Sequence, residues 1–319
     1  MQGDSLRVKV SSVSDHGAEI KAYDIVAEQG GLLPQFTAGA HVDVVLGDRL
    51  VRSYSICSSP DDRSHYRLCV ARDANGRGGS IYFHENVRRG DSLTISPPKN
   101  LFRLNESAEH SVLIAGGIGI TPLLSMAHRL HVIGRSWEIH YAARSRTAAA
   151  LLDEVEDFLK AGISVNVYFS QDVDGCRLDM ARVVNAAAAS THLYCCGPAR
   201  MLTAFAQASA GRPRETIHVE RFSPQAAPAT AGGFTVVLRK RNQSFYIPPG
   251  ETILQVLRKN GVHVSSACEE GTCGSCETVV IGGRPDHRDS ILNETERMSG
   301  ETMMICCSGS LDEELILDL

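Results

Sequence analysis

The sequence lacks the features that would place the protein in a membrane, on nucleic acid or outside the cell. No apolar run approaches the roughly 18 residues of a membrane-spanning segment. The formal net charge is −5, which gives no reason to expect nucleic-acid binding. The N-terminal residues lack the apolar segment of a signal peptide. We therefore expect a cytoplasmic protein that binds neither membranes nor nucleic acids.

Repeats and low-complexity blocks are also absent, apart from an alanine run at 186–189 that falls in an expected helix. The 319 residues, 43% hydrophobic and 22% charged, are typical of a globular protein with two or three domains. Ten cysteines would suit a disulfide-bonded secreted protein, but such proteins are usually small and exported. The reducing cytoplasm is therefore the more consistent compartment.

Near the C-terminus, the cysteines follow the pattern of a plant-type [2Fe–2S] cluster. Cys268, Cys273 and Cys276 have C-x4-C-x2-C spacing, and Cys306 and Cys307 stand about thirty residues further on. Glycines within the loop allow the backbone to pass close to a cluster. The alternatives are a zinc site or buried thiols, but zinc usually takes two separate C-x2-C pairs or added histidines, and neither is present. Either Cys306 or Cys307 could supply the fourth thiolate.

Residues 1–103 predict an antiparallel β-barrel. Their β-rich runs are separated by Gly, Pro, Asp and Ser, and most have no helical period between them. The exception is a short helix expected at 81–87, which follows a glycine pair. The expected strands are 6–13, 18–26, 41–46, 51–57, 66–71 and 92–96.

That glycine pair and the helix after it indicate a phosphate cradle. Gly78 and Gly79 leave room for an anion, Ser80 is a plausible N-cap, and the first N–H groups of the helix point toward the anion.

A second motif, at the start of a strand, complements the cradle. In Arg52-Ser53-Tyr54-Ser55, an arginine can pair with phosphate, an aromatic face can stack on a flat ring, and hydroxyls can form hydrogen bonds. By itself, the motif is equally consistent with a strand that has a polar outer face. Together, the two motifs predict a flat phosphorylated cofactor on the barrel.

Residues 104–222 have the pattern of an α/β doubly wound domain. An apolar strand at 111–115 leads into a glycine-rich turn and a helix that extends to about 130, an arrangement that binds dinucleotide pyrophosphate. Pro122 stands where the usual dinucleotide-binding fingerprint has its third glycine, and proline is well tolerated in the first turn of a helix. A tight strand–helix connection without a ligand is the alternative. Further strands at 138–142, 164–169 and 192–196 alternate with helices at 148–160, 179–189 and 199–209.

A linker and a C-terminal domain complete the chain. Residues 223–233 contain Pro, Gly and small residues but no large apolar side chain, as linkers do. Residues 234–319 predict a hairpin, a helix that ends at Gly261, the cysteine loop and a last strand. This order resembles the β-grasp (α+β) fold of ferredoxins. Its expected elements are strands at 234–238, 244–247 and 314–319 and a helix at 252–260.

The motifs and the domain order together resemble the phthalate dioxygenase reductase and vanillate O-demethylase reductase family, within the ferredoxin-NADP reductase superfamily. The resemblance covers essentially the whole chain. It implies that the protein passes electrons from NADH through FMN and one [2Fe–2S] cluster to a separate Rieske-type oxygenase. The motifs are RSYSIC, GRGGS, AGGIGITP, YCCGP, CEEGTCGSC and His287-Arg288-Asp289.

The resemblance also implies roles for single residues. Arg52 would meet the flavin phosphate, Tyr54 would cover the isoalloxazine ring and Ser55 would reach its N5 edge. Cys196 would lie beside the nicotinamide and Phe222 would shield the flavin, so that Ser55, Cys196 and Phe222 are the expected catalytic residues. Further expected cofactor-binding residues are Ser53, Arg72, Gly78, Gly79, Ser80, Gly116, Gly117, Gly119, Thr121 and Arg144.

Two features depart from the family pattern. Arg144 and Arg146 follow the second strand of the dinucleotide domain, where an Asp or Glu would bind the ribose 2′-OH and where arginines could instead meet a 2′-phosphate. We expect NADH, with NADPH as the alternative. The cysteine pair is the other departure, and the resemblance favours Cys306 because its Met-Ile-Cys setting aligns with the family's last ligand.

Two other functions fit parts of the sequence. A stand-alone flavin and iron–sulfur reductase of a small acceptor or quinone would need a substrate pocket beyond the flavin. A redox sensor would need the cluster but no nicotinamide site, so the predicted dinucleotide domain disfavours it.

Overall fold

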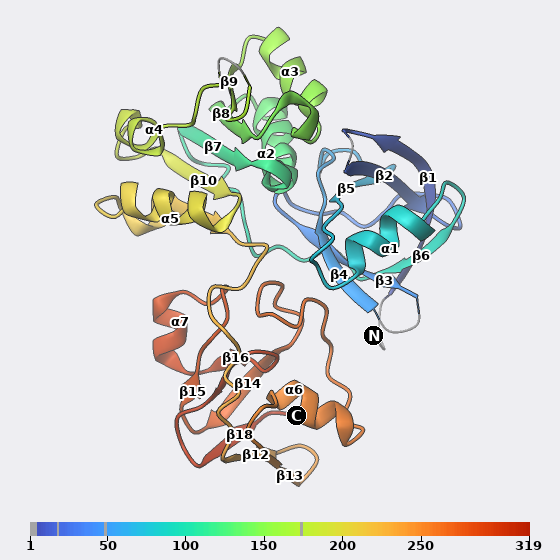
Figure 1. The fold of residues 1–319 in the computed structure, drawn as a ribbon, viewed down its shortest axis with the longest axis vertical. Helices are drawn as coiled ribbons and strands as arrows, with labels where there is room; N and C mark the ends of the chain where they lie inside the picture. The colour runs from blue at the N-terminus through green and yellow to red at the C-terminus, as the bar shows by residue number, and fades with distance from the viewer. Residues whose placement is uncertain (1–4, 18, 48–49, 173–174) are drawn as a thin grey trace. The chain divides into compact units, whose positions relative to one another are not determined.

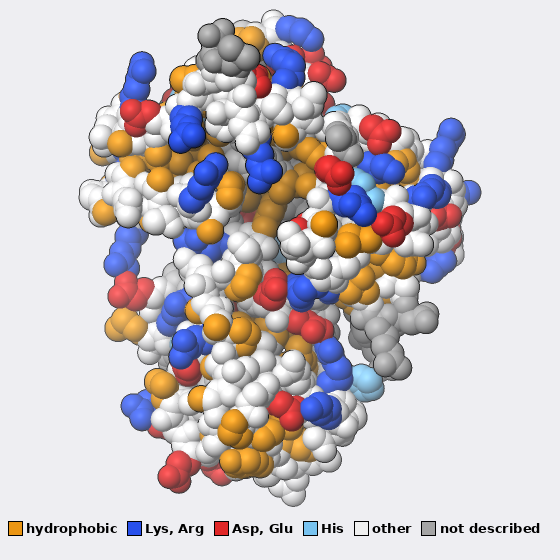
Figure 2. Space-filling model, in the orientation of Figure 1, with side chains coloured by type: hydrophobic (Ala, Val, Ile, Leu, Met, Phe, Trp, Pro, Cys, Tyr) orange, Lys and Arg blue, Asp and Glu red, His pale blue; other side chains and the backbone are white. Residues whose placement is uncertain are grey.

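The computed structural model describes residues 5–17, 19–47, 50–172 and 175–319, and it divides into two compact units, Met1–Phe222 and Ser223–Leu319. The first unit runs from blue to yellow in Figure 1 and contains a barrel and a parallel sheet. The second unit, in orange and red, contains a separate sheet. Basic and acidic side chains are interspersed on the face that Figure 2 shows. Within the described residues, no helix is long and apolar enough to cross a membrane.

The N-terminal part forms the predicted antiparallel barrel, with strand order β4-β3-β6-β1-β2-β5. Its edge strands are joined by the isolated bridge between Ile56 and Leu68, so the barrel is nearly closed. Residue 18, the first of an expected strand, lies outside the described residues. The strands are β1 (Leu6–Asp15), β2 (Ile20–Ala27), β3 (His41–Leu46), β4 (Leu50–Ser55), β5 (Tyr66–Ala71) and β6 (Ser92–Ile95).

Helix α1 (Gly79–Asn86) begins two residues earlier than the sequence predicted. Its N-cap is Gly78, whose φ of 82° is a left-handed conformation that glycine adopts without strain. Ser80 therefore lies in the first turn, and the prediction that it caps the helix is wrong. The Ser80 hydroxyl instead accepts a hydrogen bond from the N–H of Asp73 at 3.0 Å.

The predicted doubly wound domain is confirmed by a parallel sheet of order β11-β10-β7-β8-β9. The chain winds outward in both directions from β7, so the strand order reverses between β7 and β10, where such sheets bind ligands at their carboxyl ends. Helices α2 and α3 pack on one face of the sheet, and α4 and α5 pack on the other. The elements are β7 (His110–Gly116), α2 (Ile120–Val132), β8 (Ser136–Ala143), α3 (Leu152–Lys160), β9 (Ser164–Phe169), α4 (Met180–Ala186), β10 (His192–Cys196), α5 (Ala199–Ala208) and β11 (Ile217–Glu220).

Two of these helices are shorter than expected. Helix α3 begins at Leu152 because Leu151 takes a left-handed φ of 53°. Helix α4 ends at Ala186, and the guanidinium of Arg212 donates to the carbonyl oxygens of Val184, in the last turn, and of Ala187, the C-cap residue. An arginine distant in sequence thus supplies hydrogen bonds that a longer helix would have supplied.

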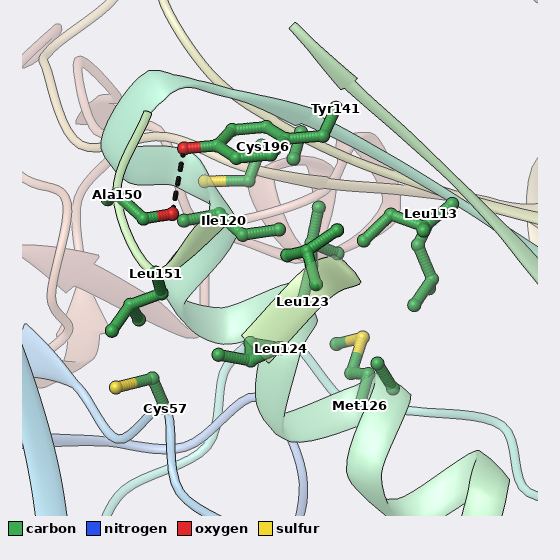
Figure 3. Packing of buried hydrophobic residues seen from close by; sticks show 14 of the residues in the cluster. Cys57, Leu113, Ile120, Leu123, Leu124, Met126, Tyr141, Ala150, Leu151 and Cys196 are labelled. Atoms are coloured by element: carbon green, nitrogen blue, oxygen red, sulfur yellow. Dashed lines mark hydrogen bonds between the residues drawn. The ribbon is translucent and has the colours of Figure 1, made fainter. Parts of the chain in front are cut away.

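The barrel and the parallel sheet share one hydrophobic core. Ile20 and Cys57 of the barrel belong to the same buried cluster as Leu124 of α2 and Cys196 of β10. Figure 3 shows part of this cluster, with the barrel residue Cys57 beside the helix that carries Leu124. This core fixes the barrel against the sheet, because protein interiors are closely packed.

The second unit has the predicted β-grasp arrangement, a five-stranded sheet of order β13-β12-β18-β14-β16 covered by helix α6. Thr252 and Gln255 form a capping box at the start of α6, and Gly261, with φ of 75°, follows its end. The elements are β12 (Phe234–Leu238), β13 (Gln243–Ile247), α6 (Ile253–Lys259), β14 (Glu277–Gly282), β15 (Pro285–Asp286), α7 (Glu294–Ser299), β16 (Thr302–Met304), β17 (Gly309–Ser310) and β18 (Glu314–Leu317).

The expected linker, residues 223–233, has no regular helix or strand but is bound to the second unit. The N–H of Ala229 donates to the carbonyl oxygen of Cys307 at 2.7 Å, and the carbonyl oxygen of Thr230 accepts from the N–H of Gly250 at 2.8 Å. Much of this segment is therefore anchored on the second unit. The domain boundaries themselves stay predictions.

Candidate functional site

The two motifs expected to bind a flavin touch each other. A Cβ built on Gly79 would lie 2.5 Å from Cγ of Arg52 and 3.2 Å from the hydroxyl oxygen of Tyr54. Glycine at 79 is therefore what allows α1 to approach β4 so closely. A Cβ on Gly78 would meet nothing within 4 Å, so the N-terminal end of α1 is open at this point. This leaves room for an anion where the cradle is expected.

Side chains around this contact are held in place. Nη1 and Nη2 of Arg52 donate to the carbonyl oxygens of Val51 and Arg77, at 2.7 and 2.8 Å. Tyr54 packs edge-on against Phe83, with 4.9 Å between ring centroids. Burial raises the pKa of Tyr54 well above its usual range, so the phenol stays neutral.

The other predicted flavin-binding side chains have protein partners or are buried. Ser53 donates to Oδ1 of Asp43 at 2.6 Å, and Ser55 is buried at the end of β4. Nη2 of Arg72 pairs with Glu85 at 3.2 Å, and its Nη1 lies 3.8 Å from Glu19. A flavin role for Arg72 stays a prediction, and sequence reasoning had no signal for its carboxylate partners.

The predicted dinucleotide turn lies between β7 and α2, at the point where the strand order reverses. Gly117 has a left-handed φ of 54°. A Cβ on Gly119 would lie 2.3 Å from the carbonyl oxygen of Cys196, and one on Gly116 would lie 2.7 Å from Cδ of Pro198. Gly116 and Gly119 are thus the residues that let α2 and the turn after β10 pack closely together.

The first turn of α2 is also ordered by a side chain. The hydroxyl of the buried residue Thr121 donates to the carbonyl oxygen of Ile118 at 2.9 Å. Pro122 is the third residue of the helix, early in α2 as predicted.

Cys196 ends β10, as expected, but its side chain is fully buried. Figure 3 shows it among the labelled residues Tyr141, Ile120 and Ala150. Burial raises the pKa of the Cys196 thiol well above its usual range, which keeps the sulfur protonated and apolar. The position agrees with a place near the nicotinamide, and the contact itself stays a prediction.

Sequence reasoning overlooked Glu220, the last residue of β11. Glu220 is paired in register with Cys196, and its Oε2 atom is buried without a hydrogen-bond partner among the described residues. Burial raises the pKa of this carboxyl from 4.5 to about 8. Its place at a strand end, two residues before Phe222, was the available signal. Phe222 is 44% exposed, so its ring is accessible, and its role in shielding the flavin stays a prediction.

The two arginines after β8 differ. Nη1 of Arg146 pairs with Glu156 at 2.8 Å, and its guanidinium lies 5.5 Å from the centroid of the Phe169 ring. For Arg144 the described part of the chain offers no ion pair. Arg144 is therefore the better placed of the two to meet a phosphate.

The cysteine loop is shaped by left-handed residues and by hydrogen bonds to sulfur. Glu270 and Thr272 donate their N–H groups to Sγ of Cys268 at 3.4 and 3.3 Å, and the N–H of Cys268 donates to Sγ of Cys273 at 3.3 Å. Gly271 has φ of 71° between the two donors. N–H donors aimed at cysteine sulfurs are what cluster thiolates require. The loop thus fits a [2Fe–2S] cluster, and all ten cysteines are free.

The sulfurs of Cys306 and Cys307 contact different groups. The thiol of Cys306 interacts with those of Cys268 and Cys276 as well as with that of Cys307, whereas Cys307 interacts with the thiol of Cys306. The sulfur of Cys307 lies where a Cβ on Gly271 would meet it at 2.4 Å. These contacts support Cys306 as the fourth ligand. Within the described residues, no group of three or more His, Cys, Asp or Glu has the arrangement of a single-ion site.

Two families match separate parts of the chain. Residues 236–309 match the 2Fe-2S iron-sulfur cluster binding domain, and residues 113–207 match the oxidoreductase NAD-binding domain. The first match covers the cysteine loop and the second covers the glycine-rich turn and β10. The predicted cluster domain and NAD-binding domain are thereby confirmed.

Curated relatives match over nearly the full length. The chain is 45% identical to the phenoxybenzoate dioxygenase subunit beta of Ectopseudomonas oleovorans, over 98% of this chain and 97% of that protein. It is 42% identical to the tetrachlorobenzoquinone reductase of Sphingobium chlorophenolicum, over 99% of this chain and 98% of that protein.

Solved structures agree. An intact type IV self-sufficient cytochrome P450 monooxygenase matches with a TM-score of 0.89 and 38% identity over 99% of this chain, which spans only 41% of that longer protein. Phthalate dioxygenase reductase, described as modular for electron transfer from pyridine nucleotides to [2Fe–2S], matches with a TM-score of 0.74 and 37% identity, over 99% of this chain and 98% of that one. The chain belongs to the phthalate dioxygenase reductase and vanillate O-demethylase reductase family of oxidoreductases.

Proposed function

We propose that this protein is the reductase component of an oxygenase or demethylase system and passes electrons from NADH through FMN and a [2Fe–2S] cluster to an oxygenase partner. The observation that carries the proposal is the presence, in one chain, of a flavin cradle, a dinucleotide turn and a loop of N–H-bonded cysteines. Bound FMN would take two electrons from NADH and release them one at a time to the cluster.

In the first unit, the chain would bind and orient the flavin and the nicotinamide. Arg52 would pair with the FMN phosphate at the open end of α1, and Tyr54 would lie on the ring. Ser55 would approach the N5 edge, with Cys196 and Phe222 around the nicotinamide. Further contacts would come from Ser53, Arg72, Gly78, Gly79, Ser80, Gly116, Gly117, Gly119, Thr121 and Arg144.

The proposed domains follow the cofactors. Residues 1–103 would bind the flavin, and residues 104–222 would bind NADH. Residues 223–233 would link the NAD domain to the cluster domain, residues 234–319. That domain would hold the cluster through Cys268, Cys273, Cys276 and Cys306. The division of the structure into Met1–Phe222 and Ser223–Leu319 supports the boundary at 222.

Flavin content tests the cradle. Arg52→Ala removes a charge-assisted partner of a phosphate, which weakens binding by about 1.5–3 kcal/mol, roughly 10- to 150-fold. Released flavin should be FMN in the wild type and should be lost from the variant on dialysis. Arg7→Ala, which removes an exposed pair with Glu28 on the same barrel, serves as the control and should keep its flavin.

The coenzyme is tested by comparing kcat/KM for NADH and NADPH. We expect NADH to be preferred, because Arg146 is paired with Glu156 and Arg144 would be the sole arginine from this turn available to a 2′-phosphate. A preference for NADPH that Arg144→Ala abolishes would overturn this assignment.

The partner is tested by reconstitution. We propose a terminal Rieske-type oxygenase, since relatives include a dioxygenase subunit and reductases of dioxygenase and demethylase systems. Product formation by a purified Rieske oxygenase should require this protein and NADH. Failure with every Rieske oxygenase from the same source would contradict the proposal.

A second function has specific support. The similarity to a tetrachlorobenzoquinone reductase suggests reduction of a halogenated quinone as the alternative. NADH-dependent turnover of tetrachlorobenzoquinone, at rates above those for cytochrome c and independent of any oxygenase, would favour it. Turnover that needs the oxygenase would exclude it.

A further inference from the structure

The second unit holds an ion pair between a buried carboxylate and a partly exposed guanidinium, and the proposed function does not use it. The Asp289 side chain is 0% exposed, whereas that of Arg297 is 35% exposed. Nη2 of Arg297 donates to the carbonyl oxygen of Asp289 at 2.6 Å and lies 3.8 Å from its Oδ1. Removing a carboxylate from water costs free energy, so the buried position of Asp289 needs an explanation.

Asp289 organises its own segment. Its Oδ1 accepts hydrogen bonds from the N–H groups of Ile291 and Leu292, at 2.9 and 2.7 Å. Its Oδ2 has no hydrogen-bond partner among the described residues, and Nδ1 of His287 is 3.8 Å away. The negative charge is thus only partly compensated, and in a dry interior its field extends further than it would in water.

The same segment is bonded to both stretches of backbone that carry the predicted cluster ligands. The N–H of Ser290 donates to the carbonyl oxygen of Gly271 at 2.8 Å. The N–H of Arg288 donates to Oγ of Ser308 at 3.1 Å. A Cβ on Gly271 would lie 2.9 Å from Cα of Asp289, so the segment packs directly on the loop.

The contact of this segment with Gly271 bears on the sulfur of Cys268. It lies between Glu270 and Thr272, whose N–H groups donate to Sγ of Cys268. A shift of Gly271 would therefore change both hydrogen bonds to a predicted ligand. Hydrogen bonds to sulfur and nearby charge are what set the potential of an iron–sulfur cluster.

We propose that Asp289 and Arg297 are positioning residues that hold Gly271 against the cluster and set its reduction potential with opposite charges. The inference rests on the proposed function for the presence of the cluster. A one-electron reduction adds negative charge to the cluster, so the Asp289 carboxylate opposes it and the Arg297 guanidinium favours it.

The test is a redox titration of the holoprotein with dithionite. The absorbance and the EPR signal of the reduced cluster monitor the titration. Asp289→Asn keeps an oxygen for the N–H groups of Ile291 and Leu292 and should raise the potential. Arg297→Met should lower it, and Arg297→Lys should lie nearer to the wild type. We expect each shift to change the ratio of oxidised to reduced cluster at least threefold, which is about 28 mV at 59 mV per tenfold.

Arg288→Met is the matched control, because its guanidinium pairs with Asp286 at the surface and should leave the potential unchanged. Potentials of Asp289→Asn and Arg297→Met that equal the control, or that shift in the same direction, would overturn the proposal. If one variant fails to hold the cluster, the direction of the potential shift in the other variant decides whether the proposal stands. If neither variant holds the cluster, the pair is structural and the proposal is wrong. The titration uses neither NADH nor a partner, so a wild type without a cluster would refute the proposed function instead.

Discussion

Glu220 is a carboxyl group that the fold keeps beside Cys196 without a hydrogen-bond partner for its Oε2 among the described residues. With a pKa of about 8, it is mostly protonated at neutral pH and can donate a hydrogen bond. It therefore offers a neutral donor at the edge where the nicotinamide is expected, and it adds no negative charge that would oppose a reduced flavin.

Glu220 also makes stability depend on pH. Its pKa is raised from 4.5 to about 8 in the folded protein, so between these values the folded state holds a proton that the unfolded state has released. Its contribution to stability therefore falls as pH rises through this window, by up to about 1.4 kcal/mol per pH unit. Glu220→Gln removes this pH-dependent contribution to the free energy of unfolding. Urea unfolding at pH 5, 6.5 and 8 should show a variant whose advantage over the wild type grows with pH, and a constant difference would contradict the burial of this carboxyl.

The cysteine pair provides a second test at the scale of the residue. Cys306→Ser should lose the cluster, because its thiol interacts with those of Cys268 and Cys276 and a hydroxyl is a poor iron ligand. Cys307→Ser should retain it, since Cys307 packs against Gly271. Iron and sulfide per chain and the visible absorbance report the outcome. Retention in the first variant together with loss in the second would assign the ligand to Cys307.

At the scale of the elements, the barrel and the parallel sheet are joined by an ion-pair network as well as by a shared core. Arg67 of β5 donates from Nε and Nη2 to the two carboxylate oxygens of Asp24 on β2, at 2.7 and 3.0 Å. Its Nη1 donates to Glu154 of α3, which also lies 3.7 Å from His128 of α2. One guanidinium thus links two strands of the barrel to a helix of the next domain.

Arg67→Met should therefore destabilise the first unit by about 1–3 kcal/mol, between the values for surface and buried pairs, because two partly buried carboxylates lose their partner. Although burial alone would raise the pKa values of Asp24 and Glu154, hydrogen bonds and charges from Arg67, Ser12 and His128 hold them below their usual range. The stabilisation is then present above about pH 4.5 and is lost as pH falls through the lowered pKa values.

Thermal unfolding at pH 7 and pH 3.5 measures both effects. The variant should melt lower than the wild type at pH 7, and the difference should shrink at pH 3.5. Arg7→Met, which removes an exposed pair with Glu28, is the control and should change little. An equal effect of the two substitutions would contradict the role of Arg67.

The sequence predicts elements well where the signal is local. Glycine and proline mark the dinucleotide turn and the start of α2, and Gly261 marks the end of α6. It fails where the partner is distant: Arg212 ends α4 by binding its last carbonyl groups, and Arg72 is paired with two glutamates. The contact between Gly79 and Arg52 could be anticipated because both motifs are recognisable, whereas the buried partners of Asp289 could not, since they depend on packing between segments.

At the scale of the whole molecule, the cofactor sites are divided between two units. The first unit contains the proposed flavin cradle and the dinucleotide turn, and the second contains the cysteine loop. Each unit has its own hydrophobic core, so loss of the cluster should leave the first unit folded. Electron transfer can therefore be interrupted at the cluster alone.

The central claim is that electrons reach the partner only through the cluster, and the rate of NADH-driven cytochrome c reduction by Cys273→Ser tests it most directly. The substitution replaces a thiolate with a poor iron ligand. Cys176→Ser, which changes an exposed cysteine outside the loop, is the control. In the cluster-free variant NADH should still bleach the flavin and ferricyanide should still be reduced, while cytochrome c reduction collapses. A variant that lacks the cluster yet reduces cytochrome c at the wild-type rate would contradict the account.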